Sequence, residues 1–203
     1  MLYKTLQIIM SVSHKIHRRF WHYYTVTLLK YYNVECVNPQ FNGRIYLKLS
    51  SNKNISIGKN FYCNSGPAYC INSSAYTKII VKPNARLEIG ENTGISSTVI
   101  SCSNHIHIGN GVNIGSGSVI MDSNFHSTNP VLRGNREEKE NDIRTCPVII
   151  GDNVFIGAHS LILKGVEIGN NSIIAAGSVV TKSIPANEVW GGNPAKFIKK
   201  LNV

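Results

Sequence analysis

The 203-residue sequence contains no apolar run long enough to cross a membrane. A transmembrane helix needs about 20 consecutive apolar residues, and no stretch of the chain approaches that length. The N-terminus is also a poor secretory signal, because the short apolar stretch from Leu6 to Val12 is followed by basic residues where a cleavage site would stand. We therefore expect a cytoplasmic protein, with peripheral contact at the inner face of the membrane as the alternative.

Closely spaced cysteine pairs are missing too. The five cysteines form an odd, scattered set without C-x-x-C spacing. They are Cys36, Cys63, Cys70, Cys102 and Cys146. This pattern differs from a disulfide framework and predicts reduced thiols, each behaving as a small, mostly buried hydrophobe.

Acidic residues, glycine and proline are all absent from residues 1–34. That segment mixes five basic residues with aromatic ones, and we expect one or two helices there. A second basic cluster lies near the C-terminus, at Lys182, Lys196, Lys199 and Lys200. The net charge of +10 favours an anionic partner. No helix-turn-helix or zinc-finger pattern accompanies either cluster, so we expect a phosphate-bearing cofactor or a membrane surface and no nucleic acid.

What the sequence does contain is a repeat of six residues. Branched aliphatic residues recur at Ile150, Ile156, Ile162, Ile168, Ile174 and Val180, with an earlier run at Ile108, Ile114 and Ile120. The residue that follows is usually glycine or alanine, as at Gly151 and Ala175. A helix cannot keep a period of six on one face, and simple strand alternation would not require a small residue at a fixed phase. The pattern predicts a parallel β-helix in which each hexapeptide forms one short side and the aliphatic residue points inward.

The repeat stops between Ile120 and Ile150, where the sequence becomes polar. Residues 127–147 contain Asn129-Pro130 and a run of charged residues, so we expect a loop inserted into the solenoid, and long loops on regular scaffolds are often functional. We divide the chain into an N-terminal helical and basic segment over residues 1–41, a β-helix over 42–184 and a C-terminal cap over 185–203. A short closing helix is expected within the cap, from Ala195 to Leu201.

Several motifs resemble those of the hexapeptide acyltransferases, the group that includes galactoside, maltose and serine acetyltransferases. They are Met121-Asp122-Ser123-Asn124-Phe125-His126, Ile150-Gly151-Asp152-Asn153-Val154-Phe155-Ile156-Gly157-Ala158, Ala175-Ala176-Gly177-Ser178-Val179-Val180-Thr181-Lys182 and Gly192-Asn193-Pro194-Ala195-Lys196. Within that group the chain looks most like bacterial O-acetyltransferases that modify surface polysaccharide. The resemblance implies a left-handed β-helix, a homotrimer with active sites between neighbours, and direct transfer of acetyl from acetyl-CoA to a sugar hydroxyl, without a metal.

Such a transfer needs a general base, because a sugar hydroxyl does not ionise at neutral pH. Histidine, with a free pKa of about 6.5, suits that role. His126 stands where the coil gives way to the polar loop, and it matches the family's catalytic position. Asp122 and Asn124 precede it and are candidates to orient it, although a structural turn role for Asp122 is nearly as well supported.

Coenzyme A would need small side chains beside its pantetheine arm and cations beside its phosphates. The resemblance assigns CoA contacts to Ala158 and Ala176. We add Gly177, Thr181, Lys182, Lys196 and Lys199 as candidates, and Phe155 and Trp190 as rings that either pack against the cofactor or belong to the core.

Other interpretations stay open at this point. One is N-acetylation of an amino sugar, an antibiotic or another xenobiotic, which the sequence hardly separates from O-acetylation. A zinc enzyme of the γ-carbonic anhydrase type is disfavoured because His105 and His107 are too closely spaced for that family's ligands. The third is a scaffold without catalysis, or a nucleic-acid binder that uses the net charge of +10. The N-terminal segment either lies on an anionic membrane or, as we favour, packs on the trimer or forms part of the acceptor site.

Overall fold

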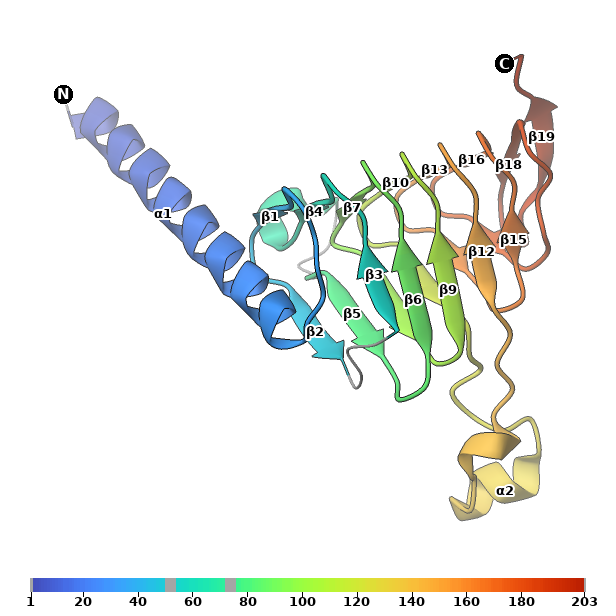
Figure 1. Ribbon diagram of the computed structural model, residues 1–203. Coiled ribbons are helices and arrows are strands. Elements are labelled where there is room, and N and C mark those ends of the chain that lie inside the picture. The colour runs from blue at the N-terminus through green and yellow to red at the C-terminus, as the bar shows by residue number, and fades with distance from the viewer. Residues whose placement is uncertain (1, 50–53, 72–75, 203) are drawn as a thin grey trace.

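The computed structural model describes residues 2–49, 54–71 and 76–202. One long helix, α1 (Leu2–Tyr31), precedes a solenoid of short parallel strands (Figure 1). Sheet A contains β1 (Gln40–Asn42), β4 (Tyr62–Asn64), β7 (Gly94–Ser96), β10 (Asn113–Ile114), β13 (Phe155–Ile156), β16 (Ile173–Ile174), β18 (Glu188–Gly191) and β19 (Lys196–Lys200). Sheet B contains β2 (Tyr46–Leu49), β5 (Lys78–Val81), β8 (Val99–Cys102), β11 (Val119–Met121), β14 (Leu161–Ile162) and β17 (Val179–Val180). Sheet C contains β3 (Ile55–Ile57), β6 (Arg86–Ile89), β9 (His105–Ile108), β12 (Val148–Ile150) and β15 (Glu167–Ile168).

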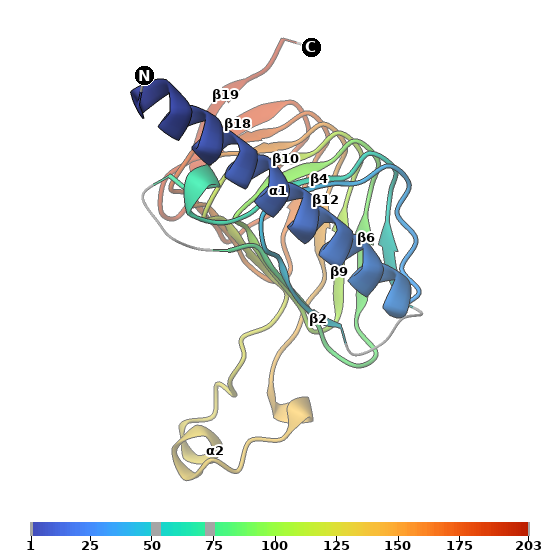
Figure 2. The same cartoon turned by 90° about the vertical axis from the view of Figure 1, so that its left-hand side faces the viewer.

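The chain visits the three sheets in turn, so each coil is a triangle with one strand on each side (Figure 2). We name its corners by the sheets that they join, in chain order: corner AB, corner BC and corner CA. The predicted left-handed parallel β-helix is confirmed.

Inward aliphatic side chains form columns through the stacked coils. In sheet A, Ile95 pairs in register with Ile114, Ile114 with Ile156 and Ile156 with Ile174. All four are at most 3% exposed. Burial of such side chains is the main stabilising contribution in a solenoid, and the period of six places one of them on each side.

Small residues are required where the coils approach each other at the corners. A Cβ atom added to Gly157 would lie 2.5 Å from the backbone nitrogen of Ala176 in the next coil. At corner CA asparagines adopt the left-handed backbone region, as Asn153 (φ 57°) and Asn171 (φ 61°) do. Their amides form a ladder, because the Asn153 Nδ2 donates to Asn171 Oδ1 at 3.3 Å. Asparagine tolerates this conformation better than most residues do, so the ladder closes that corner.

The helix α1 covers the N-terminal end of the solenoid. Its buried residues Thr25 and Leu29 lie in its C-terminal half, and it packs against β1, while its first turns project away from the coils (Figure 1). Within the described residues, no helix has both the length and the apolar character that membrane crossing requires.

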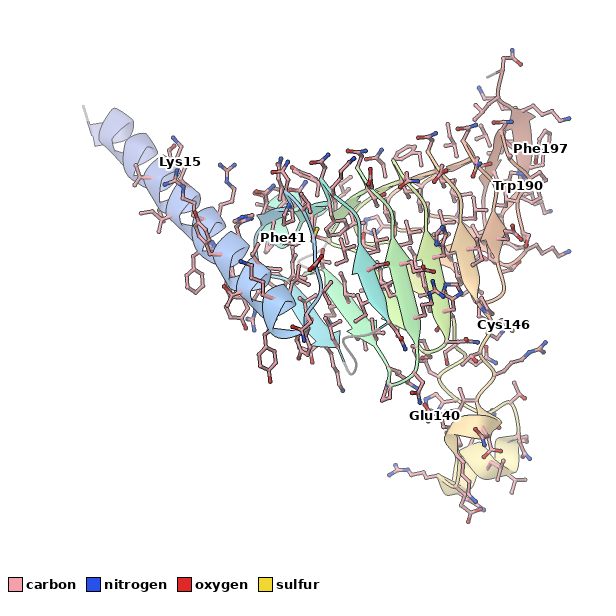
Figure 3. All side chains as sticks on the ribbon, in the orientation of Figure 1. Lys15, Phe41, Glu140, Cys146, Trp190 and Phe197 are labelled. Carbon is pink, nitrogen blue, oxygen red and sulfur yellow. The ribbon has the colours of Figure 1, made fainter. Side chains whose placement is uncertain are left out.

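The prediction of a C-terminal helix is wrong. Residues 196–200 form strand β19, which pairs antiparallel with β18. Figure 3 shows Trp190 and Phe197 together at this end of the solenoid, with their ring centroids 6.4 Å apart. The last strand of sheet A would otherwise leave unpaired N–H and C=O groups, and a returning strand satisfies them where a helix would not.

Among the described residues, two segments leave the regular coil. The first, which we call the strap (residues 65–71), follows β4 at corner AB and contains the 3₁₀ turn η1 (Pro67–Tyr69). The second, the loop (residues 122–147), leaves at corner BC and projects far from the solenoid (Figures 1 and 2). It carries α2 (Pro130–Asn135) and the 3₁₀ turn η2 (Glu140–Asp142).

Candidate active site

Hydrogen bonds between residues of the loop stabilise its conformation. Its two ends form an antiparallel stalk in which the Cys146 N–H donates to Asp122 O at 3.0 Å and the Asn124 N–H to Arg144 O at 3.1 Å. Farther out, the Asn129 side chain accepts from Val131 N at 2.9 Å and caps α2. Asparagine at the N-cap followed by proline is a favoured start for a helix, so the local sequence fixes where α2 begins.

His126 lies just beyond the stalk and pairs with a carboxylate from the far side of the loop. Its Nδ1 is 2.9 Å from Glu138 Oε2. Its side chain is 68% exposed, whereas that of Glu138 is 14% exposed. The hydrogen bond from His126 and the one from the Ser127 N–H lower the pKa of Glu138 below its ordinary value.

This contact assigns the tautomer of His126. A carboxylate accepts hydrogen bonds, so Nδ1 carries the proton and Nε2 of the neutral ring presents a lone pair. Among the described residues, Nε2 has no protein partner. The imidazole therefore has the arrangement of an oriented general base.

The two residues expected to orient His126 lie elsewhere. Asp122 is fully buried, and its carboxylate accepts from the backbone N–H groups of Ser103 and Asn104, both at 2.7 Å. It therefore fixes the turn that follows β8. Asn124 contributes its backbone N–H to the stalk. The structure brings neither side chain into contact with His126.

A groove of about 450 Å³ runs along sheet A toward corner AB. Its lining is mostly apolar or small and includes Phe155, Ala158 and Ala176, three of the expected CoA contacts. Tyr69, Ile71, Ser96, Gly115, Ser116, Gly157, Ile173, Ile174 and Ala175 complete it. Small side chains leave backbone amides within reach of an extended, amide-bearing ligand, which is what a pantetheine arm requires.

The remaining expected CoA contacts lie outside the lining of this groove. Gly177 (φ 71°) continues corner AB and donates its N–H to Ala158 O at 2.8 Å. Trp190 is partly buried against the core, and its Nε1 donates to Glu188 Oε2 at 2.8 Å. The rest are exposed near the C-terminal end: Thr181 and Lys182 follow β17, and Lys196 and Lys199 lie on β19.

The strap forms one wall of the groove. The Ile71 N–H donates to Ser116 Oγ at 3.1 Å, and the His159 Nε2–H donates to Ile71 O at 2.7 Å. The sequence placed this region within the predicted β-helix of residues 42–184 and gave no prediction of the strap. Gly66-Pro67 marks its departure from strand structure, but no local signal says that it folds back over the next coils.

Glu138 was also missed. It lies in a run with Glu137, Glu140 and Asp142, and only the folded loop shows which carboxylate reaches His126.

Within one chain the two halves of the candidate site lie on different corners. His126 belongs to corner BC, and the groove to corner AB. Sheet B separates the two corners.

Strand β9 carries two histidines. His105 and His107 face outward around the buried Ile106, and their ring nitrogens lie 2.9 and 3.7 Å from Glu88 Oε2. Burial acts to raise the pKa of Glu88, but hydrogen bonds from His105 and Arg86 outweigh it and lower the pKa.

In the part of the chain that the structure describes, no group of three or more His, Cys, Asp or Glu side chains is placed to hold a metal ion.

Comparison with known proteins agrees with this architecture. Residues 147–182 match the family described as the hexapeptide repeat of succinyl-transferase. The chain is 35% identical over 153 residues to the galactoside O-acetyltransferase of Escherichia coli K12, covering 75% of this chain and 57% of that protein. It is similar in structure to the N-acyltransferase AntD of Bacillus cereus in complex with dTDP and 3-hydroxybutyryl-CoA, with a TM-score of 0.67, 21% identity and 88% of each chain covered.

A third similar structure is a hexapeptide-repeat acetyltransferase of Vibrio cholerae complexed with acetyl coenzyme A. It has a TM-score of 0.57 and 22% identity over 86% of this chain and 74% of that one. The chain spans only 57% of the length of the galactoside O-acetyltransferase. The six-residue repeat, the family match over residues 147–182 and the galactoside O-acetyltransferase match together confirm the predicted resemblance to the hexapeptide-repeat acyltransferases.

Proposed function

We propose that the protein is an acetyltransferase that moves an acetyl group from acetyl-CoA to a hydroxyl of a sugar, in the synthesis of a surface polysaccharide or lipopolysaccharide. One observation carries the proposal: His126 is held through Nδ1 by Glu138, with Nε2 available, on a loop at the edge of a solenoid that also has a groove of small residues. The galactoside O-acetyltransferase match supports a sugar acceptor.

The reaction follows from this arrangement. His126 Nε2 removes the proton of the acceptor hydroxyl as its oxygen attacks the thioester carbonyl. The C–S bond then breaks, and the imidazolium returns the proton to the departing thiolate, so that the products are the acetyl ester and CoA. The Glu138 carboxylate stabilises the imidazolium between these steps. No residue of the enzyme is acetylated.

Acetyl-CoA would lie with its pantetheine arm in the groove beside Ala158 and Ala176. Gly177 and Thr181 would extend this surface along the later coils, and Phe155 would contact the arm from sheet A. Lys182, Lys196 and Lys199 are exposed near the C-terminal end, where they would neutralise the phosphates. Acetyl-CoA is a cytoplasmic metabolite, and a scattered set of cysteines without C-x-x-C spacing also suits that compartment.

The active enzyme would be a homotrimer. Since corner BC carries the base and corner AB carries the groove, a neighbour must bring its groove to the His126 of the next subunit. Three equivalent contacts close a ring, which is how a heterologous interface terminates.

Thiol release from acetyl-CoA, measured against a panel of sugars, tests the activity. We expect acceptor-dependent release of CoA that is lost in His126→Ala. Normal turnover by that variant with a true acceptor would refute the mechanism.

A complementation experiment tests the shared site. His126→Ala removes the base, and Ala176→Trp fills the groove, so each variant alone should be inactive. Co-expressed subunits should regain activity, because a mixed trimer contains sites with an intact base from one subunit and an intact groove from another. Failure to regain activity, with mixed trimers demonstrated by mass spectrometry, would place the whole site within one subunit.

A further inference from the structure

The structure contains a second cavity at corner AB, between α1 and the strap. Its volume is about 230 Å³. Its polar and aromatic lining comes from His17, Arg18 and Trp21 on α1, Arg44 after β1, and Tyr69 and Tyr76. We propose that this cavity between α1 and the strap binds a phosphate-linked sugar, that is, a glycosyl phosphate or diphosphate, and that this ligand is the acetyl acceptor. The identification as acceptor rests on the proposed function, whereas the binding itself does not.

Charge points to an anionic ligand. Two guanidinium groups line the cavity, and no carboxylate does. Within the described residues, neither Arg18 nor Arg44 forms an ion pair. Arg44 instead lies over the Trp21 ring, 5.6 Å from its centroid. Arginine pairs in a planar, bidentate manner with phosphate oxygens, so these groups are suited to a ligand that the protein itself does not supply.

His17 adds a further donor. Its Nε2 accepts a hydrogen bond from the Trp21 Nε1–H, so Nδ1 carries the proton of the neutral ring and can donate to a phosphate. This hydrogen bond also fixes the Trp21 ring relative to the helix.

Aromatic rings supply a surface for a sugar. Trp21, Tyr69 and Tyr76 all line the cavity. Gly66 (φ 110°) lies beside them, and a Cβ atom there would approach the Tyr76 ring to 3.1 Å, so glycine keeps this wall open. The cavity is smaller than a typical drug-sized site of about 300–1,000 Å³. It therefore suits one phosphorylated sugar unit better than an oligosaccharide.

The position of the cavity connects it to the donor groove. Tyr69 lines both spaces, and the strap that carries Tyr69 is anchored on the coils of corner AB. A phosphate held by Arg18 and Arg44 would leave the attached sugar beside Tyr69, at the end of the groove nearest α1. The two substrates would then lie along one corner, with the anionic anchor of the acceptor at one end and the acyl donor at the other.

Tryptophan fluorescence of the full chain tests the binding. The sequence has two tryptophans, and Trp190→Phe leaves Trp21 as the only reporter. The probes are UDP-N-acetylglucosamine as a nucleotide-linked sugar, farnesyl diphosphate as a polyprenyl diphosphate, free N-acetylglucosamine, and CoA. We expect one or both diphosphates to change Trp21 emission saturably, and which one does so distinguishes a nucleotide-linked from a lipid-linked acceptor.

Neighbouring arginines provide a matched control. Arg18→Gln and Arg44→Gln should each weaken binding about tenfold or more, the loss expected for a charge-assisted hydrogen bond. Arg19→Gln removes the same charge one residue away, outside the cavity lining, and should change the dissociation constant less than about threefold. Equal weakening by all three variants would indicate general attraction and overturn the proposal.

Two further outcomes would overturn it. One is equal binding of the neutral sugar. The other is an Arg44-dependent change of Trp21 emission by CoA, which would assign the cavity to the donor. The proposed function can fail independently of the binding site. If the diphosphate binds but no sugar is acetylated, the proposed reaction is refuted and the binding site stands. If a sugar is acetylated at a rate that Arg18→Gln and Arg44→Gln leave unchanged, the reaction stands and the role of the cavity as acceptor site is refuted.

Discussion

The loop and the strap both interrupt the same solenoid, but they are stabilised in opposite ways. The loop projects from the coils (Figure 2), and internal hydrogen bonds stabilise it beyond the stalk, such as the cap at Asn129 and the pair formed by His126 and Glu138. The strap lies flat on the coils, where Ser97, Ser116 and His159 bind it. An inserted segment can therefore place a reactive group without supporting the fold, or line a groove by becoming part of the fold.

Replacing His126, the proposed base, is the change that should distinguish the loop from the strap most strongly. His126→Ala should lower kcat/KM by about 10²- to 10⁴-fold, the usual contribution of a general base. Its midpoint of urea unfolding should stay close to that of the wild type, since the side chain is 68% exposed. Loss of stability comparable to that of a core variant would show that the loop does support the fold.

Removing the partner of the base should have a smaller effect. Glu138→Gln keeps the shape but loses the charge that orients and stabilises the imidazolium, so kcat/KM should fall about ten- to a hundredfold. Glu137→Gln is the matched control and should keep nearly full turnover. If the two variants behave alike, the contact between His126 and Glu138 does not assist the reaction.

A strap variant, unlike a loop variant, should lower the stability of the fold. Ser97 is buried, and its Oγ accepts from the Gly66 N–H at 3.3 Å and from Cys70 Sγ at 2.8 Å. Ser97→Ala leaves a buried N–H group without that partner, which costs about 1–3 kcal/mol of unfolding free energy. The exposed Thr128 of the loop provides the comparison, because Thr128→Ala should change stability by less than about 0.5 kcal/mol. Urea unfolding measures both, and equal effects would remove the distinction between the segments.

The smallest expected effect is a shift in the pKa of Glu138. The pKa of Glu138 is lowered by hydrogen bonds from His126 and the Ser127 N–H, so it lies below the ordinary glutamic acid value of about 4.3. The contact should therefore be complete above that value and lost as the pH falls through the lowered pKa. NMR titration of the Glu138 carboxyl should show this low midpoint, and in His126→Ala the midpoint should move back toward the ordinary value. A midpoint unchanged by the substitution would contradict the contact.

The regular part of the fold could be predicted from the sequence because its rule is local and repeated. A period of six with a small residue at a fixed phase leaves few alternatives, and Ile114, Ile156 and Ile174 stack as that rule requires. The position of His126 was also accessible, since it follows the last regular strand before the polar loop and matches a family motif.

The rest depends on contacts that the local sequence does not encode. Several carboxylates follow His126, and only the folded loop shows that Glu138 is the one that reaches it. Asp122 was expected beside the imidazole, yet two backbone N–H groups hold it in the core. A short closing helix was predicted from Ala195 to Leu201, but the open edge of sheet A binds this segment as a strand.

That returning strand has a consequence for the whole particle. A solenoid of identical coils has no intrinsic length, and an open last coil could accept another chain and polymerise into a fibre. Here α1 covers one end of the solenoid, and the antiparallel strand β19 covers the other. This strand exposes three lysines to solvent, Lys196, Lys199 and Lys200. The particle is thereby given a finite size, and its polymeric growth is blocked by geometry and by charge repulsion.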